Sequence, residues 1–385
     1  MRVAIFGGGT VGGGVCELLE KYYPEIQIVF LIVKNASRVR DFQVPKNCVL
    51  SSDPDVFWKA AQSVDVVVDA MGGLDLAWEV TSKCLSMGIA VVSGNKALIS
   101  RKMAEIESIG GRFLFEAAVC GGIPVINALL RGMRGDSISQ ISGVMNGSTN
   151  WMLDKMDRDS VSYESLLVEA SKLGYLEADP SADILGWDTR SKLCILARIC
   201  FGRTLNENEV VCRGINRVTA ADIAFAKSLE MRIKLIGRAW IDNGTVHAFV
   251  CTTFVKETDA LGNLSGATNC VSFDAKYSGH NVLTGSGAGR YPTANSVVAD
   301  ILSLTEKPSG AKKNLFGDVQ EPTKPFGRDF KAKFYIGSKF ADTGIKLRAA
   351  GIEVTCIEQA FVTTENVLYS EVEALLRGDD SLIVF

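Results

Sequence analysis

The sequence contains little histidine and no closely spaced cysteine pairs. Only two of its 385 residues are histidines, and its ten cysteines include no C-x-x-C pair. Zinc sites in proteins are usually built from such pairs and from histidines, so the sequence argues against a zinc centre. Most of the cysteines are expected to be small core residues in a reducing compartment.

The sequence also lacks an excess of basic residues and a long apolar segment. Its 41 lysines and arginines are balanced by 44 acids, which gives a net charge of -3. Without a basic stripe, nucleic-acid binding has no electrostatic basis. The apolar runs, such as residues 28–33, are too short to span a bilayer, and the chain starts with a strand rather than a signal peptide. We therefore expect a cytoplasmic protein with neither nucleic-acid nor membrane partners.

The residues that are abundant indicate an α/β protein. Hydrophobic residues make up 47% of the sequence, aromatic ones only 8%, and there are 37 glycines, a mixture typical of α/β enzymes with tight turns. In the first part of the chain, apolar runs alternate with helical segments, which predicts a doubly wound parallel sheet of the Rossmann type. The strands expected there are residues 2–6, 26–33, 64–69, 89–92 and 112–115, and the helices are residues 15–23, 75–87 and 100–108.

A glycine loop follows the first predicted strand. Gly7, Gly9 and Gly12 stand in G-x-G-x-x-G register, with Thr10 and Val11 between the last two. Glycine at these positions allows a tight turn and lets backbone N–H groups approach a pyrophosphate at the start of the next helix. Because a strand precedes it and a helix follows, the pattern predicts a dinucleotide site rather than an ordinary turn.

The end of the second predicted strand bears on the choice of dinucleotide. An acid there would bind the ribose 2′-hydroxyl of NAD, but this strand ends in Lys34 and is followed by Arg38 and Arg40. Cations at this position can bind the 2′-phosphate of NADP. We favour NADP, with NAD as the alternative in which these residues are solvated surface charges.

The rest of the chain has a different pattern. The strands expected are residues 137–145, 232–241, 245–255 and 270–273, and the helices are a segment from Ser148, then 163–173, 182–201 and 293–304. This order predicts an α+β substrate domain. The tail reads strand, helix, strand, strand, helix, strand. The predicted division is 1–134 for the dinucleotide, completed by a helix at 291–305, then 135–290 for substrate, 306–330 as linker and 331–385 as an α+β tail module.

Several polar segments follow the predicted strands, at the sheet edge where ligands bind in open α/β sheets. They are residues 93–96, 115–124 and 143–150. Lys96 can meet a phosphate, a carboxylate or a nicotinamide carboxamide there, and Glu116 adds an acid to a tightly turned backbone.

The richest polar cluster runs from residue 174 to residue 192. Asp188 and Lys192 are four residues apart on a predicted helix and therefore share one face. The alternative is an ordinary surface ion pair, which contributes little. Further acids precede the pair and the helix continues with apolar residues, which favours a buried functional site.

Taken in order, these segments resemble homoserine dehydrogenases. The likeness covers about residues 1–305 and is carried by Asn95–Lys96 and by residues 116–119, 146–150, 177–192 and 285–294. It implies an NAD(P)-dependent oxidoreductase that interconverts L-aspartate 4-semialdehyde and L-homoserine. Such an enzyme serves the biosynthesis of threonine, methionine and isoleucine, and the resemblance also implies a homodimer or larger homo-oligomer, formed through the middle domain.

The resemblance implies roles for five charged residues. Lys192 matches the lysine that transfers a proton, and Asp188 matches its partner acid. Lys96 matches a lysine at the junction of cofactor and substrate. Substrate binding falls to Glu177, Asp183 and Asp188, with Glu177 on the amino group.

The resemblance also implies cofactor contacts beyond the glycine loop and a monovalent-cation site. The further cofactor residues are Met71, Gly72, Lys96, Gly174 and Gly289. The cation, sodium, would be held in a structural role by the Glu116 carboxylate and by the carbonyls of Val119, Gly121 and Ile123.

Three residues and the tail depart from the family pattern. Cys120 replaces a usual glycine, either as a packing variation, which we favour, or as a thiol near the cofactor that is sensitive to oxidation. Met145 and Trp187 are bulkier than expected. The tail resembles a shortened ACT-type regulatory domain without the usual turn after its first strand. A dimerisation role therefore stands beside effector binding, with threonine feedback as a hypothesis.

Two other functions remain as alternatives. One is another semialdehyde or amino-acid dehydrogenase on the same scaffold. Aspartate semialdehyde dehydrogenase needs a nucleophilic cysteine with a histidine nearby, and both histidines, His247 and His280, come late in this chain. The second is a non-catalytic amino-acid sensor, which would be expected to have lost Lys192 or Asp188.

Overall fold

The computed structural model describes residues 1–159, 161–173, 179–305, 324–340, 342–358 and 360–385. The chain forms two compact units. The first contains the described parts of residues 1–137, 194–204 and 285–321, and the second those of 138–193, 205–284 and 322–385. The predicted division into a substrate domain, a linker and a tail module stays a prediction, because the second unit holds both the middle of the chain and its tail.

A parallel sheet forms the centre of the first unit, which confirms the predicted doubly wound fold. Its strands are β1 (Arg2–Phe6), β2 (Gln27–Ile32), β3 (Val49–Ser51), β4 (Val66–Asp69), β5 (Ala90–Ser93) and β6 (Phe113–Leu114). They lie in the order β3-β2-β1-β4-β5-β6, and every neighbouring pair is parallel. This is the strand order of dinucleotide-binding folds, in which ligands bind at the carboxyl ends of the central strands.

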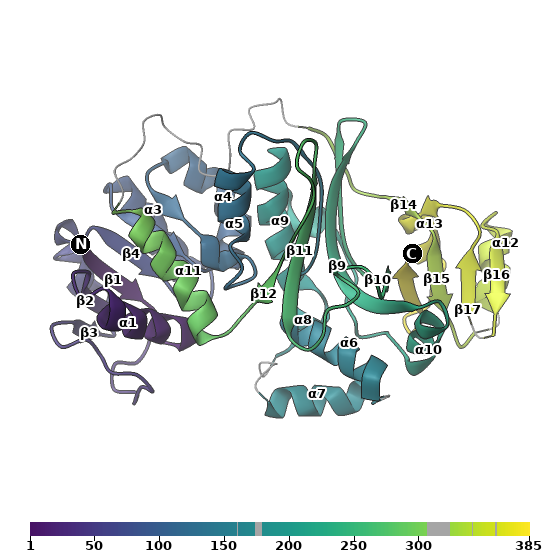
Figure 1. Ribbon diagram of the computed structural model, residues 1–385, viewed down its shortest axis with the longest axis horizontal. Helices are drawn as coiled ribbons and strands as arrows, with labels where there is room; N and C mark the ends of the chain where they lie inside the picture. The colour runs from purple at the N-terminus through teal and green to yellow at the C-terminus, as the bar shows by residue number, and fades with distance from the viewer. Residues whose placement is uncertain (160, 174–178, 306–323, 341, 359) are drawn as a thin grey trace. The chain divides into compact units, whose positions relative to one another are not determined.

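Helices surround this sheet (Figure 1). They are α1 (Thr10–Tyr22), α2 (Asp55–Trp58), α3 (Asp75–Ser86), α4 (Lys96–Ile109), α5 (Val125–Asn127) and α11 (Arg290–Ser303), with short turns at Ala61–Ser63, Glu116–Ala118 and Ala128–Gly132. Helix α11 packs closely on α1. A Cβ on Gly13 would lie 2.6 Å from the Arg290 guanidinium, and one on Gly14 would lie 2.9 Å from Ala294 Cβ. Gly13 and Gly14, inside α1, therefore serve this helix packing.

Helices α1 and α4 begin four or more residues earlier than predicted. Helix α1 begins at Thr10 and not at residue 15, so the glycine loop is shorter than expected. Helix α4 begins at Lys96 and not at residue 100, because the Asn95 side chain caps it by accepting a hydrogen bond from Leu98 N at 3.1 Å. Both corrections place polar residues at the start of a helix.

The second unit is built on a mixed sheet with the order β12-β11-β7-β9-β10-β19-β15-β17-β16. The long strands are β7 (Ile138–Val144), β9 (Met231–Asp242), β10 (Thr245–Lys256), β11 (Thr268–Ala275) and β12 (Gly279–Ser286). The tail adds β15 (Phe334–Gly337), β16 (Val354–Ile357), β17 (Ala360–Thr363) and β19 (Ser381–Val384). Short strands at Val211–Cys212 and Phe326–Gly327 pair with β10, and Lys331–Ala332 pairs with Val367–Leu368.

The helices of the second unit are α6 (Gly147–Asp159), α7 (Tyr163–Lys172), α8 (Ser181–Ile184), α10 (Ala220–Ser228), α12 (Asp342–Ala349) and α13 (Tyr369–Glu373), with a turn at Glu207–Glu209. Helix α9 (Trp187–Phe201) begins in this unit. The prediction of one helix over residues 182–201 is wrong, because Gly186 has a φ of +83° and separates α8 from α9. This break places Asp188 in the first turn of α9.

The main elements of the tail have the predicted order, with the short strand pair Lys331–Ala332 and Val367–Leu368 in addition, and the last strand joins the larger sheet. Thr253 of β10 pairs with Val384 of β19. Asp222 of α10 accepts a hydrogen bond from Ser381 Oγ at 3.0 Å. Among the described residues, we find no helix that is both long and apolar enough to cross a membrane.

Candidate active site

The glycine loop lies at the carboxyl end of β1, at the centre of the parallel sheet. Gly7 has a φ of +106°, and a Cβ there would lie 2.3 Å from the carbonyl oxygen of Ala70. A Cβ on Gly12 would lie 1.9 Å from the Gly7 carbonyl oxygen. Gly9, which precedes Thr10 and Val11 at the start of α1, has no atom within 4 Å of its would-be Cβ. The loop thus leaves open space at a helix N-terminus, where an anion binds favourably.

A network of buried polar groups fixes the ends of β4 and β5. Asp69 is 1% exposed; its carboxylate accepts hydrogen bonds from Met71 N at 3.0 Å and Ser93 Oγ at 2.8 Å. Burial raises the pKa of Asp69 to about 6, although these hydrogen bonds oppose the shift. The Asn95 amide donates to the carbonyl of Gly73 at 2.7 Å. The turn that contains Met71 is therefore held beside the turn that leads into α4.

Three further predicted cofactor residues stand at turns or helix starts of this unit. A Cβ on Gly72 would meet nothing within 4 Å, so this backbone is also open to a ligand. Half-buried Lys96 is the first residue of α4. Gly289 has a φ of +112° and directly precedes α11. Gly174 and Glu177 lie outside the described residues.

The segment after β2 contains the cations that were predicted to select the cofactor. Lys34 and Arg38 are exposed. Arg40 instead folds back on its own segment, where its guanidinium donates to the carbonyls of Arg38 at 2.7 Å and Asn35 at 2.9 Å. Two cations are thus exposed to solvent, while the third braces the segment that contains them.

Glu116 is a buried acid at the predicted cation site. It is 2% exposed; its carboxylate accepts hydrogen bonds from Ile126 N at 2.9 Å and Asn127 N at 2.7 Å. Its own N–H donates to the Asp300 carboxylate at 2.8 Å. Burial raises the pKa of Asp300 to about 7, and the charge of Glu116 adds to the shift, whereas Arg131 and the hydrogen bond oppose it. A cation near these two acids would offset their mutual repulsion.

The carbonyls predicted to complete that site belong to a sharply bent segment. Val119 is fully buried, and Cys120 and Gly121 have φ values of +54° and +44°. The Gly121 carbonyl accepts a hydrogen bond from Ser296 Oγ at 2.7 Å, and Ile123 accepts one from a backbone N–H at 2.8 Å. Each carbonyl oxygen has a second lone pair. Carbonyl oxygens are among the ligands that hard cations prefer.

Lys192 and Asp188 form a buried ion pair in the second unit. Lys192 Nζ lies 2.7 Å from Asp188 Oδ2, and the two residues are 7% and 5% exposed. The alternative of a surface ion pair is therefore wrong. Lys192 Nζ also donates to the carbonyl of Met145 at 2.6 Å. A lysine held between a carboxylate and a carbonyl is placed to exchange a proton with a substrate oxygen and to stabilise negative charge on it.

Asn146 brings the two acids of this cluster together. Its Nδ2 donates to Asp183 Oδ1 at 2.6 Å and to Asp188 Oδ2 at 2.9 Å. Its Oδ1 accepts a hydrogen bond from Thr149 N at 2.9 Å, which orients the amide and caps α6. The turn that contains Asn146 was predicted to lie at the ligand-binding edge of a sheet, but no role was predicted for Asn146 itself. A polar residue between a buried strand and a helix was the available signal.

The three residues that depart from the family pattern occupy distinct places. Cys120 is fully buried in a left-handed conformation, which explains why glycine would suit this position and favours the packing interpretation. Met145 is also fully buried, and its side chain lies within 3.0 Å of a would-be Cβ on Gly143. Trp187 is 45% exposed at the start of α9.

Comparisons with known proteins agree with this geometry. Residues 7–110 match the model of the homoserine dehydrogenase NAD-binding domain, and residues 124–302 match that of homoserine dehydrogenase. A homoserine dehydrogenase of Corynebacterium glutamicum is 32% identical, over 90% of this chain and 84% of its own. The solved homoserine dehydrogenase of Thiobacillus denitrificans has a TM-score of 0.85 at 29% identity and covers 100% of this chain and 97% of its own.

A further solved structure is relevant to the cofactor. It is a hyperthermophilic archaeal homoserine dehydrogenase in complex with NADPH, with a TM-score of 0.65 at 25% identity, covering 80% of this chain and 98% of its own. The chain combines a parallel sheet and its glycine loop with a buried lysine–carboxylate pair. The relatives that it matches over most of their length are homoserine dehydrogenases. The chain belongs to the homoserine dehydrogenase family, whose members are NAD(P)-dependent oxidoreductases that act on a CH–OH group.

Proposed function

We propose that this chain interconverts L-homoserine and L-aspartate 4-semialdehyde, and that the Lys192–Asp188 pair moves the proton. The buried pair is the observation that carries the proposal. Lys192 lies 2.7 Å from Asp188, and burying both charges costs desolvation free energy, so a role in the reaction explains the pair better than a role in stability. A nicotinamide cofactor, when bound, would supply or accept the hydride. In the direction of aldehyde reduction, Lys192 gives its proton to the aldehyde oxygen, which becomes the hydroxyl group of homoserine.

The neighbouring side chains bind and orient the substrate. Asp188 holds the Lys192 ammonium, and Asn146 holds Asp188 beside Asp183. We assign Asp183 and Asp188 to substrate binding, with Asp188 at the substrate's reacting end, and Glu177 to its amino group. We assign Lys96 to the junction of cofactor and substrate, where it can contact the nicotinamide carboxamide or the substrate carboxylate. Acids and lysines suit a substrate that contains both an ammonium and a carboxylate.

We also propose a preference for NADP over NAD. It is supported by exposed Lys34 and Arg38 after β2 and by the absence of an acid at the end of that strand in the sequence. The double variant Lys34→Ala/Arg38→Ala should raise the KM for NADP and leave the KM for NAD unchanged. Equal KM values for NADP in the variant and the wild type would contradict the assignment.

A structural sodium ion is proposed at Glu116 and the carbonyls of Val119, Gly121 and Ile123. The buried pair of acids, Glu116 and Asp300, supports a cation there. Sodium chloride should therefore raise the unfolding temperature more than choline chloride of equal ionic strength. Equal effects of the two salts would count against the site.

A cytoplasmic homo-oligomer is the remaining part of the proposal. All ten cysteines are free thiols, as suits a reducing compartment. The oligomer follows from the family resemblance and can be measured by light scattering. Whether the tail binds threonine is tested by initial rates at saturating threonine.

The central experiment follows the absorbance of reduced nicotinamide. Purified protein is mixed with L-homoserine and either NADP or NAD, and Lys192→Ala is assayed beside Lys276→Ala, which alters an exposed lysine next to Tyr277. We expect the wild type and Lys276→Ala to reduce the cofactor and Lys192→Ala to be inactive. If the wild type is inactive in both directions, the proposal fails and the sensor alternative stands. If Lys192→Ala retains full activity, the reaction stands and its assigned proton donor is wrong.

A further inference from the structure

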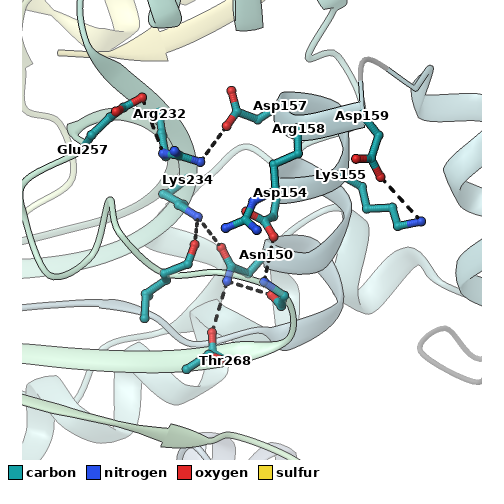
Figure 2. Close-up of polar contacts among 12 residues, drawn as sticks. Asn150, Asp154, Lys155, Asp157, Arg158, Asp159, Arg232, Lys234, Glu257 and Thr268 are labelled. Atoms are coloured by element: carbon teal, nitrogen blue, oxygen red, sulfur yellow. Dashed lines mark hydrogen bonds and ion pairs between the residues drawn. The ribbon is translucent and has the colours of Figure 1, made fainter.

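A second lysine of this unit is buried without any part in the proton transfer described above. Lys234 lies on β9 and is 1% exposed. Its Nζ donates to Asn150 Oδ1 at 2.8 Å and to the carbonyl of Leu264 at 2.7 Å (Figure 2). Both acceptors are neutral, so neither of these two bonds compensates the positive charge of the buried ammonium. Burying such a charge costs desolvation free energy, which suggests that Lys234 has a function beyond filling space.

Acidic and basic groups surround Lys234 at a greater distance. Burial lowers the pKa of Lys234 to about 8, and the charge of Arg232 and, more weakly, that of Arg158 add to this shift. Asp154 and Asp157 of α6 oppose it. Near pH 7 the lysine is therefore still mainly protonated, and it can donate strong hydrogen bonds.

The contacts of Lys234 continue along a chain of hydrogen bonds to the catalytic acids. Asn150, which accepts a bond from Lys234, donates its backbone N–H to the Asn146 carbonyl at 3.2 Å. The Asn146 amide in turn donates to Asp183 and Asp188 at 2.6 and 2.9 Å. Lys234 and Lys192 thus stand at the two ends of one connected series of polar groups.

Asn150 is held on its other side as well. Its Nδ2 donates to the carbonyls of Gly266 at 2.9 Å and Thr268 at 3.2 Å (Figure 2). One turn later, Asp154 accepts a hydrogen bond from Gly266 N at 2.8 Å. These bonds join the first turns of α6 to β9 and to the start of β11. Helix α6 consequently has little freedom to slide or rotate under Asn146.

We propose that Lys234 is a positioning residue for the reaction, which holds the first turn of α6 so that the Asn146 amide keeps Asp183 and Asp188 in place. The inference rests on the roles proposed above for those two acids. Displacement of a catalytic group by about 1 Å can reduce a rate by up to about 100-fold, so a contact one helical turn away is close enough to matter. The alternative is that Lys234 only stabilises the fold.

The test compares Lys234→Met with Arg232→Met. Methionine keeps most of the volume of lysine but cannot donate to Asn150. Arg232 is a matched control, since it is bonded to Asp157 at the far end of α6, at 2.7 Å. For Lys234→Met we expect kcat with homoserine to fall by about tenfold or more, with the dissociation constant for NADPH unchanged. Arg232→Met should keep kcat within about twofold of the wild type at a comparable loss of thermal stability.

A double-mutant cycle separates positioning from stability. Asn146→Ser retains a helix-capping oxygen but removes the amide that contacts both acids. If Lys234 acts through Asn146, the double variant Lys234→Met/Asn146→Ser should have nearly the same kcat/KM as Asn146→Ser alone. If the two residues act independently, the fold-reductions in kcat/KM of the two single variants should multiply in the double variant. Multiplied effects, or a wild-type kcat in Lys234→Met, would overturn the proposal. Should Lys234→Met not fold, Lys234→Gln is measured in the same cycle. An inactive wild-type enzyme would instead refute the proposed function.

Discussion

Alanine at Gly12 would test how closely the glycine loop and α1 approach each other. Its Cβ would lie 1.9 Å from the carbonyl oxygen of Gly7 and 3.0 Å from the carbonyl carbon. Ordinary contacts begin at 3.4 Å, so the two segments must separate by about 1.5 Å (3.4 − 1.9 Å). Both obstructing atoms belong to the backbone, and no side-chain rotation can relieve the overlap.

The separation should weaken both the fold and the binding of the cofactor. Helix α1 places Val15, Cys16 and Leu19 in the core with no exposed surface, so a shift of the helix disturbs close packing. Overpacking of this kind costs about 1–3 kcal/mol in the free energy of unfolding. The N–H groups at the start of α1 would be displaced from a bound pyrophosphate by a similar distance. Losing one hydrogen bond to a charged group, about 1.5–3 kcal/mol, should weaken NADPH binding by roughly 10- to 150-fold.

Gly9→Ala is the matched comparison within the same loop. No atom lies within 4 Å of its would-be Cβ, and its φ of −90° is accessible to alanine. The free energy of unfolding should therefore stay at the wild-type value. The added methyl group occupies the space that a pyrophosphate needs, so NADPH should bind about tenfold more weakly, which corresponds to roughly 1.4 kcal/mol.

The assay is a fluorescence titration with NADPH, run beside urea denaturation of each variant without cofactor. Gly12→Ala should change both measurements and Gly9→Ala only the first. Wild-type NADPH affinity in Gly9→Ala would refute the placement of the pyrophosphate at this loop. Wild-type stability in Gly12→Ala would refute the close approach of α1 and Gly7.

Three further predictions concern stability and the cofactor segment. The folded-state pKa of Asp300, about 7, lies above its ordinary value of 3.8, so its favourable contribution is complete below pH 3.8 and is lost as the pH rises through 7. Asp300→Asn should remove this loss, at most about 4 kcal/mol, and an unchanged pH dependence of urea denaturation would contradict this. Gly186→Ala forces alanine to a φ of +83° and should cost about 1–2 kcal/mol, lowering the unfolding temperature; an unchanged temperature would rule out this strain. Arg290 donates a hydrogen bond to Asp41 at 2.7 Å, and Asp41 lies at the far end of the segment after β2 that contains Lys34 and Arg38. Arg290→Met should therefore raise the KM for NADP and leave kcat unchanged. An unaltered KM would show that this ion pair does not position the segment.

The parallel sheet could be predicted because its strands are buried on both faces. Such strands appear in the sequence as uninterrupted apolar runs, and β4 and β5 are buried at every position. Strand β12 was missed for the opposite reason. It is largely exposed, so its sequence has no apolar pattern. Helix α10 was missed although Thr219 and Asp222 form a capping box, which is a signal that the sequence does contain.

The candidate site was predictable where local spacing determines it. Asp188 and Lys192 had to share a helix face, but their burial arises from the tertiary fold, in which Lys192 donates to the carbonyl of Met145, 47 residues earlier in the chain. The contact of Asn146 with Asp188 spans 42 residues and has no periodic signature. The assigned roles of Glu177 and Gly174 stay predictions because both lie outside the described residues.

The position of β19 has a consequence for the order of folding. This strand lies between β10 and β15, and its residue Val384 pairs with Thr253, well over a hundred residues earlier. Closing so long a loop costs chain entropy before any contact is gained, and folding rates fall as contacts become less local. Until β19 docks, one edge of β10 is left without this partner, and unpaired edges favour aggregation. Refolding of the second unit should therefore be slow and sensitive to protein concentration.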